Sequence, residues 1–264
     1  MTRDLSVRSG ADLFEVRFES IGGLGAHVAG KIVAGAAVLR MNMNGSHFSS
    51  YGSEKKGSVV RSFIRLAPAD SAIRTSAPIE EPDVVVVFHS GLLAHPATLS
   101  GLKAGGTLIF AGHEGDVPAG LERAPSTARV FRVDAQKIAI DEKSRENAVL
   151  IGALAEAVPE LDRHSVLDAL TATFAGKSAA VVDANTRAFN RGADEIERIA
   201  DVGQQDGDVP TMQSHPAWGY RSAPIGGVLP TPGNTAHNDL HTSRTGWMPI
   251  LERDKCIDCG MCDM

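Results

Sequence analysis

FEVRFESIGGLGAHVAGKIVAGAA, residues 14–37, is the stretch that decides the fold. Its first six residues alternate apolar and charged side chains, which is the period-2 pattern of a strand with two unlike faces. From residue 26 the apolar side chains recur instead at the spacing of a helix with one apolar face. Those side chains are Val28, Ile32, Val33, Ala36 and Leu39. We therefore expect a strand over 14–21 and a helix over 26–41.

Three glycines, Gly22, Gly23 and Gly25, separate the expected strand from the expected helix. Glycine has no Cβ, so the backbone there turns tightly and points several N–H groups into one concavity. The helix start adds partial positive charge, which favours an anion. The spacing G-G-x-G departs from the dinucleotide fingerprint, and residues 42–44 supply no acid for a ribose. Two interpretations stay open: an anion site, or a turn that only packs tightly.

Length and charge narrow the class of protein. A chain of 264 residues can bury one substantial core. The net charge of −6 argues against a nucleic-acid partner. No charge-free apolar run approaches the roughly 18 residues of a membrane span, and residues 1–12 carry no apolar signal region. We expect a cytoplasmic protein with no membrane contact.

The rest of the first 200 residues alternates strands and helices. A run of four valines and a phenylalanine at 84–88 is typical of a strand covered on both faces. The alternation predicts an α/β fold, a doubly wound and mostly parallel sheet with flanking helices. The expected strands are 14–21, 58–66, 84–88, 107–111 and 130–133, and the expected helices are 26–41, 92–102, 144–158, 162–174 and 180–199.

Residues 42–57 are polar and glycine-rich, so we expect a long surface loop. Long loops inside compact domains are usually functional. After residue 200 the composition changes: 201–250 holds six prolines and no helical period. Such a segment is either a linker or an extended arm, and its two tryptophans favour the arm. The predicted organisation is an N-terminal arm (1–12), the α/β domain (13–200), the arm (201–250) and a final segment (251–264).

All three cysteines, Cys256, Cys259 and Cys262, lie in the final segment with the spacing C-x2-C-x2-C. They are therefore not a disulfide scaffold. Three thiolates at this spacing suit one face of a [4Fe–4S] cluster, although the sequence stops before the fourth cysteine of the bacterial ferredoxin run. A zinc knuckle or three inert thiols are the alternatives, and no second C-x2-C hairpin supports zinc.

Four pieces together carry a family resemblance: the glycine turn, YGSEKKG at 51–57, PDVVV at 82–86, and the cysteine cluster. They resemble the gamma subunit of the 2-oxoacid:ferredoxin (acceptor) oxidoreductases, the pyruvate synthase family. That family has G-G-Q-G in its turn and Y-G-P-E-R-R-G in its loop. The present sequence departs from these motifs at Leu24, Ser53, Lys55 and Lys56. The resemblance covers about 14–200, and 251–264 look like the start of a ferredoxin-like delta part.

Asn185 and Gly192, in NTRAFNRG, also fit a late helix of that family. The resemblance implies a fold, partners and a ligand. Thiamine diphosphate with Mg²⁺ would lie on alpha and beta subunits, and Fe–S clusters would pass electrons to ferredoxin or another acceptor. This chain would contribute no catalytic residue but would help bind coenzyme A and join alpha, beta and delta-type subunits.

The residues that the resemblance assigns to coenzyme A are Gly22, Gly23, Gly25, Tyr51, Gly52, Glu54, Lys55, Lys56 and Gly57. Lysine ammonium groups can meet phosphates electrostatically, although a solvated turn explains them equally well. Glu54 could instead pair with a lysine or with a partner subunit. Two other functions stay open: a stand-alone nucleotide-binding α/β module, and a structural scaffold.

Overall fold

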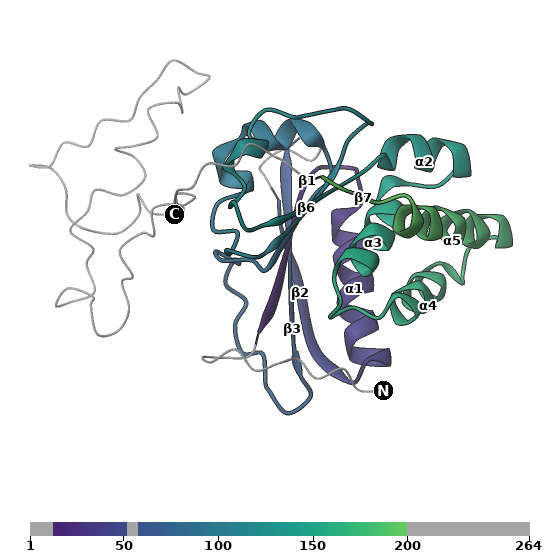
Figure 1. Cartoon of the computed structure of the whole chain (residues 1–264). Coiled ribbons are helices and arrows are strands. Elements are labelled where there is room, and N and C mark those ends of the chain that lie inside the picture. Colours follow the sequence, from purple (N-terminus) through teal and green to yellow (C-terminus); the bar gives the residue numbers. More distant parts are fainter. Residues whose placement is uncertain (1–12, 52–57, 200–264) are drawn as a thin grey trace, which may run out of the picture. The chain divides into compact units, whose positions relative to one another are not determined.

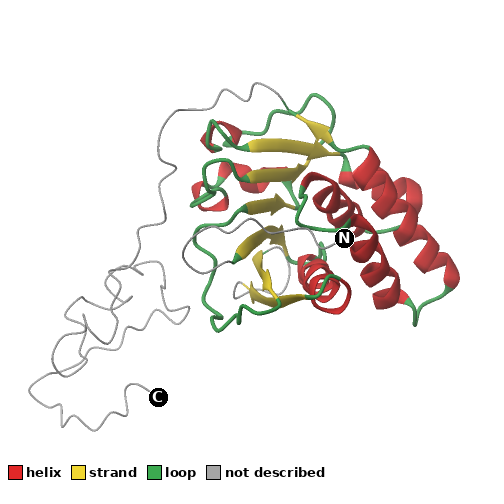
Figure 2. Ribbon diagram, turned by 60° about the horizontal axis from the view of Figure 1, so that its bottom comes forward, coloured by secondary structure: helices red, strands yellow, loops and turns green. Residues whose placement is uncertain are grey.

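A computed structural model describes residues 13–51 and 58–199 (Figure 1). In these residues a seven-stranded sheet carries five α-helices on one of its faces (Figure 2). The predicted α/β class is confirmed. The predicted arms and the cysteine segment lie outside the described residues, so those domain assignments stay predictions.

The strand order is β2-β3-β1-β4-β5-β6-β7. The bounds are β1 Phe14–Ile21, β2 Met43–Tyr51, β3 Val59–Pro68, β4 Val84–Val87, β5 Thr107–Ala111, β6 Arg129–Val133 and β7 Glu197–Arg198. The four neighbours β1, β4, β5 and β6 pair in parallel, whereas β3, β2 and β7 pair antiparallel with their neighbours. The sheet is therefore mixed, with a parallel centre and antiparallel additions at both ends.

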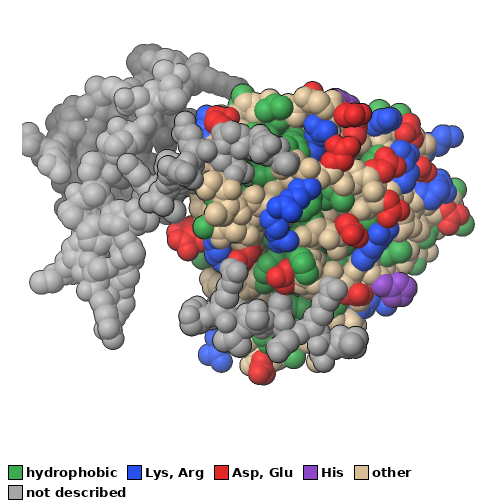
Figure 3. All heavy atoms as spheres, viewed as in Figure 1, with side chains coloured by type: hydrophobic (Ala, Val, Ile, Leu, Met, Phe, Trp, Pro, Cys, Tyr) green, Lys and Arg blue, Asp and Glu red, His purple; other side chains and the backbone are tan. Residues whose placement is uncertain are grey.

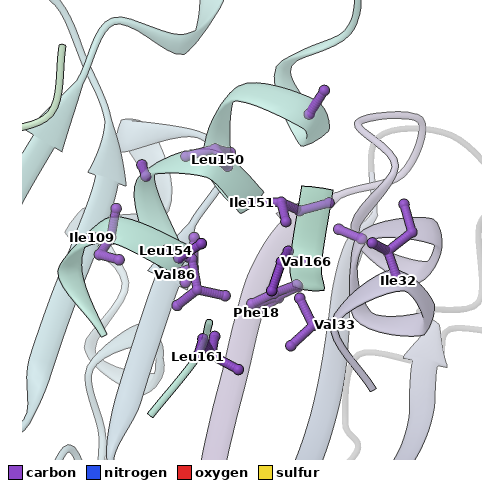
Figure 4. Close-up of a cluster of buried hydrophobic side chains, with 14 of the residues drawn as sticks. Phe18, Ile32, Val33, Val86, Ile109, Leu150, Ile151, Leu154, Leu161 and Val166 are labelled. Atoms are coloured by element: carbon purple, nitrogen blue, oxygen red, sulfur yellow. The ribbon is translucent and has the colours of Figure 1, made fainter. Parts of the chain in front are cut away.

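The helices cover the sheet unequally. The α-helices are α1 Ala26–Arg40, α2 Ala135–Glu142, α3 Glu146–Ala157, α4 Arg163–Phe174 and α5 Ala179–Asp194. On the other face, over β4, β5 and β6, a smaller apolar cluster includes residues of the short 3-10 helices Ser90–Ala94 (η1) and Leu121–Arg123 (η3). Figure 4 shows the larger cluster, in which Phe18 of β1 and Val86 of β4 meet Ile151 and Leu154 of α3. Because both faces are covered, β4 is buried along its whole length.

The predicted loop over 42–57 is wrong for its first part, because Met43–Tyr51 forms the edge strand β2. It pairs with β3 without a break from Met43 to Tyr51. Its residues up to Ser49 are half-buried, since His47 and Ser49 face α1 while Phe48 stacks on Phe63 of β3 with ring centroids 4.8 Å apart. The apolar alternation that marks most strands is absent here.

Two other predicted elements differ, and one helix was not predicted. The expected helix over 92–102 is two 3-10 helices, Ser90–Ala94 and Pro96–Thr98 (η2). Pro96, the first residue of η2, disfavours a helical conformation at His95, which lies between the two. The expected helix over 180–199 ends at Asp194, and Glu197–Arg198 then pairs with β6. Helix α2 was not expected; it begins after Asp134, whose side chain accepts a hydrogen bond from the backbone N–H of Lys137.

The predicted apolar face of α1 is partly wrong. Val28 and Leu39 are exposed, at 36% and 81%. The buried face contains more small side chains: Ala26, Ala29, Gly30, Ile32, Val33, Ala34, Ala36 and Ala37. These small residues let α1 lie close to the sheet, and a Cβ at Gly30 would fall 2.5 Å from the His47 ring.

Glycines also set the contact between α3 and α5. A Cβ on Gly152 would lie 2.0 Å from the carbonyl oxygen of Phe189, and one on Gly192 would lie 2.1 Å from that of Val149. Asn185 is buried, accepts a hydrogen bond from Ser144 Oγ and donates to the carbonyl of Val181. Both residues of the late-helix resemblance, Asn185 and Gly192, therefore have packing roles.

Candidate functional site

The turn between β1 and α1 needs its glycines at two positions. Gly23 has φ 108° and Gly25 has φ 84°, both in the left-handed region that side chains disfavour. The backbone N–H of Leu24 donates to the carbonyl of Ile21 at 3.2 Å, which closes the turn. The predicted strand–turn–helix is confirmed, and the turn lies at the carboxyl end of β1.

The start of α1 has no anionic partner within its own first turn. Gly25 occupies the N-cap without a side-chain cap, and the first turn holds no acidic residue. The positive end of the helix dipole is thus uncompensated locally, which favours an anion at this point. From α3, the Asn147 Nδ2 lies 2.8 Å from where a Cβ on Gly25 would be, so a residue larger than glycine would collide with it.

Ser58, where the described chain resumes after β2, lies at this same turn. Tyr51, the last residue of β2, pairs with Val60, and Ile21 pairs with Val59. The backbone N–H of Gly22 then donates to the carbonyl of Ser58 at 2.9 Å. Tyr51 and Ser58, the two residues that flank 52–57, are therefore held at the end of the sheet where β1 finishes and the glycine turn begins.

The structure thus brings Gly22, Gly23, Gly25 and Tyr51 to the same end of the sheet, the carboxyl end of β1. The remaining loop residues of the predicted set lie outside the described residues; these are Gly52, Glu54, Lys55, Lys56 and Gly57. The same holds for the predicted cluster ligands Cys256, Cys259 and Cys262. Within residues 13–51 and 58–199, no group of three or more His, Cys, Asp or Glu side chains could hold a metal ion.

The turn also lies where the chain reverses direction across the sheet. From β1 the chain moves to β2 and β3 on one side, and from β4 it moves to β5 and β6 on the other. In open α/β sheets, ligands bind outside the carboxyl ends of the strands at such a switch point. The two neighbouring parallel strands at this switch point are β1 and β4.

A histidine–serine cluster next to the turn was not predicted. His27 Nδ1 lies 3.1 Å from Ser49 Oγ, which lies 3.3 Å from His47 Nε2 and 2.6 Å from Ser62 Oγ. Burial, and to a smaller extent the charges of His27 and Lys31, lower the pKa of His47 to about 4. The cluster holds β2 on α1 with a neutral His47. Recognising residues 43–51 as a strand would have placed 47, 49 and 51 on one face.

A second unpredicted pair lies at the ends of β5 and β6. His113 Nδ1 is 2.8 Å from Asp134 Oδ2, and the hydrogen bond to Asp134 raises the pKa of His113. Asp134 also caps α2, so its carboxylate has a structural role. Both side chains are too accessible for this pair to resemble a buried catalytic dyad.

Comparisons with known proteins agree with this architecture. The family model described as pyruvate ferredoxin/flavodoxin oxidoreductase matches residues 15–195. Pyruvate synthase subunit PorC of Thermotoga maritima is 32% identical over 187 residues, which cover 70% of this chain and 95% of the relative. The crystal structure of pyruvate oxidoreductase subunit PORC from the same organism has a TM-score of 0.61 and 29% identity, over 72% of this chain and 99% of that one.

Two further comparisons extend the picture. The pyruvate/ketoisovalerate oxidoreductases common subunit gamma of Thermococcus litoralis is 35% identical over 169 residues, covering 62% of this chain and 89% of the relative. The 2-oxoglutarate:ferredoxin oxidoreductase of Magnetococcus marinus, solved with 2-oxoglutarate, coenzyme A and succinyl-CoA bound, has a TM-score of 0.59. It is 20% identical over 75% of this chain and 34% of that chain, so it shows a shared fold alone.

The α/β fold with its mixed sheet is thus that of a subunit of an oxidoreductase complex. The chain belongs to the pyruvate ferredoxin/flavodoxin oxidoreductase family, as a gamma-type subunit. In the part of the chain that the structure describes, no helix is long and apolar enough to cross a membrane.

Proposed function

We propose that this gamma-type subunit helps to bind coenzyme A in a cytoplasmic complex that oxidatively decarboxylates a 2-oxoacid to an acyl-CoA. In this proposal, thiamine diphosphate with Mg²⁺ lies on alpha and beta subunits. A delta-type part, with Fe–S clusters, passes the electrons to ferredoxin or another acceptor. The C-terminal cysteines of this chain would hold part of one [4Fe–4S] cluster.

The observation that carries the proposal is the position of the two described residues that flank 52–57. The hydrogen bond from the Gly22 N–H to the Ser58 carbonyl, at 2.9 Å, holds Ser58 at the turn that leads into the uncapped start of α1. A ligand there would meet the helix dipole together with Lys55 and Lys56. Coenzyme A carries phosphates that suit both, and a relative in fold was solved with coenzyme A bound.

The residues of this chain would bind and orient and take no part in bond breaking. The glycine turn would offer backbone N–H donors without a side chain in the way. The two lysines would attract phosphate as point charges. Thiamine diphosphate would supply the carbanion chemistry, on a partner subunit.

The test uses the assembled complex with Lys55→Ala and Lys56→Ala combined. We expect the apparent KM for coenzyme A to rise about tenfold while kcat changes little, because uniform binding energy is lost. The matched control is Lys137→Ala with Lys177→Ala, two exposed lysines elsewhere on the domain. An unaltered KM for coenzyme A in the Lys55/Lys56 variant would remove the proposed phosphate contact.

A further inference from the structure

Charged side chains form cross-strand rows on the sheet face opposite the α-helices. Arg65 of β3 lies beside Glu15 of β1 with Nε 2.7 Å from Oε1, and Arg61 lies beside Glu19 in the same register. Arg17 stands between the two glutamates along β1. Three arginines therefore face two glutamates, which leaves one positive charge in excess.

Glu19 is the buried centre of this arrangement. It is 1% exposed, and Arg17 Nε and Arg61 Nε each lie 3.0 Å from one of its carboxylate oxygens. Burial raises the pKa of Glu19, and the two arginines oppose that rise. The Glu19 carboxylate thus has two arginine partners. These two arginines differ in how many of their N–H donors are used within the domain.

Arg17 has no freedom to use its donors elsewhere. Its Nη1 donates to the carbonyl of Ile79 at 3.2 Å, and its Nη2 donates to the carbonyls of Thr98 and Ser100 at 3.0 and 2.8 Å. It is 5% exposed. Arg17 therefore ties the covering loops to β1 and fixes one side of the Glu19 carboxylate.

Arg61 is in a different position. Both of its hydrogen bonds to Glu19 use Nε, at 3.1 and 3.0 Å. In the described part of the chain no acceptor takes a hydrogen bond from its Nη1 or Nη2, and the side chain is 31% exposed. With respect to residues 13–51 and 58–199, four of the five N–H donors of this guanidinium are thus available to a ligand.

The place of Arg61 relates it to the candidate site. Arg61 lies three residues after Ser58, a distance of about 10 Å along a strand. The carbonyl of Ser58 accepts the hydrogen bond from the Gly22 N–H. Its cross-strand neighbour Glu19 lies three residues before the glycine turn. The pair Glu19–Arg61 therefore lies nearer the turn than the pair Glu15–Arg65, which is four residues farther along the same strands.

We propose that Arg61 is a phosphate-binding residue of this subunit, with Glu19 as the positioning residue that holds its Nε and turns its Nη groups outward. The proposal rests on the proposed function, since the phosphate would belong to coenzyme A. Arginine suits this role because its planar fork can hold Glu19 and a phosphate at once.

The experiment measures equilibrium binding of coenzyme A, dephospho-coenzyme A and phosphate-free pantetheine to the assembled complex. Arg61→Gln should weaken both phosphate ligands about tenfold and leave pantetheine unchanged. Arg61→Lys should fold, because its ammonium can still pair with Glu19. It should nevertheless bind the phosphate ligands as weakly as Arg61→Gln, because that pairing consumes its one charged group.

The control is Arg40→Gln. Arg40 is 37% exposed and pairs with one carboxylate, Asp168, at 3.0 Å, but it lies at the opposite end of α1 from the turn. It should leave all three affinities unchanged.

Unchanged affinity for coenzyme A in a folded Arg61→Gln complex, or an equal loss for pantetheine, would overturn the inference. If the Lys55/Lys56 variant still weakens coenzyme A in that case, the proposed function stands without Arg61. If neither variant changes the affinity, the proposed function fails as well.

Discussion

Gly23 and Gly25 share a left-handed backbone but differ in what surrounds them. A Cβ at Gly23 would have no heavy atom within 4 Å, whereas one at Gly25 would lie 2.8 Å from Asn147 Nδ2. The two positions therefore separate backbone strain from steric collision within one turn.

Alanine substitutions at Gly23 and Gly25 should measure the backbone strain and the steric collision separately. Gly23→Ala carries only the left-handed strain, so we expect it to lower the free energy of unfolding by about 1–2 kcal/mol. Gly25→Ala adds the collision with Asn147, so its loss should be larger by about 1 kcal/mol or more. Urea unfolding of the full chain measures both. Equal losses would show that Asn147 moves away freely.

His47 predicts a pH dependence of stability. Its folded pKa of about 4 is below the unfolded value of about 6.5, so the unfolded state binds more protons between these values. Stability is therefore fully present above pH 6.5 and falls as the pH drops toward 4. The loss should be about 2 kcal/mol once solvent screening of the half-buried ring is allowed for.

The matched variants for this prediction are His47→Gln and His164→Gln. His164 is 83% exposed and has only a long contact of 4.0 Å to Asp168. Unfolding measured from pH 7 to pH 4.5 should become flatter for His47→Gln and should keep the wild-type slope for His164→Gln. The same slope in wild type and His47→Gln would place the titrating group elsewhere.

At the scale of elements, β2 is the strand that its own sequence does not predict. It pairs with β3 along its whole length, and it is an edge of the sheet. Hydrogen exchange of the full chain should therefore protect about every second amide of Met43–Tyr51, those that bond to β3. Uniformly fast exchange over these nine residues would contradict the strand.

The α3–α5 contact offers a second test at this scale. Gly192→Ala would place a Cβ 2.1 Å from the Val149 carbonyl oxygen, a backbone atom that cannot rotate away. We expect a loss of about 3 kcal/mol or more in the free energy of unfolding. The control is Gly35→Ala in α1, where nothing lies within 4 Å and helix propensity predicts a gain of about 0.5–1 kcal/mol.

Some elements follow from local pattern alone. The strand at Phe14–Ile21, the buried run at Val84–Val87 and the glycine turn all carry their signal within a few residues. Strand β2 does not, because its His47 and Ser49 are half-buried against α1 and its Phe48 packs on Phe63 of β3. Propensity also missed β7, which exists only because β6 offers an open edge.

The candidate site shows the same division. Gly22, Gly23 and Gly25 are predictable because a strand–glycine–helix sequence has few other conformations. The His27–Ser49–His47 cluster and the outward Arg61 are not, because they depend on register between strands. Sequence spacing carries no information on which residues face each other across such pairings.

At the scale of the whole domain, charge is distributed differently on the two faces of the sheet. Figure 3 shows acidic and basic side chains interspersed over the helical side. Arg191 of α5 there bonds to Asp141 and Glu142 of α2 and to its own Glu195. In this group one positive charge meets three negative charges, so the excess is negative. The rows around Glu19, close to the glycine turn, have the opposite balance, with three arginines facing two glutamates.

In the proposed function, the glycine turn and residues 51–60 receive coenzyme A in the assembled complex. Hydrogen exchange of that complex with and without coenzyme A tests it most directly. We predict slower exchange at residues 22–28 and 51–60 when coenzyme A is present, and no change in α4 and α5. Unchanged exchange at both segments, under conditions where coenzyme A is bound, would contradict the account.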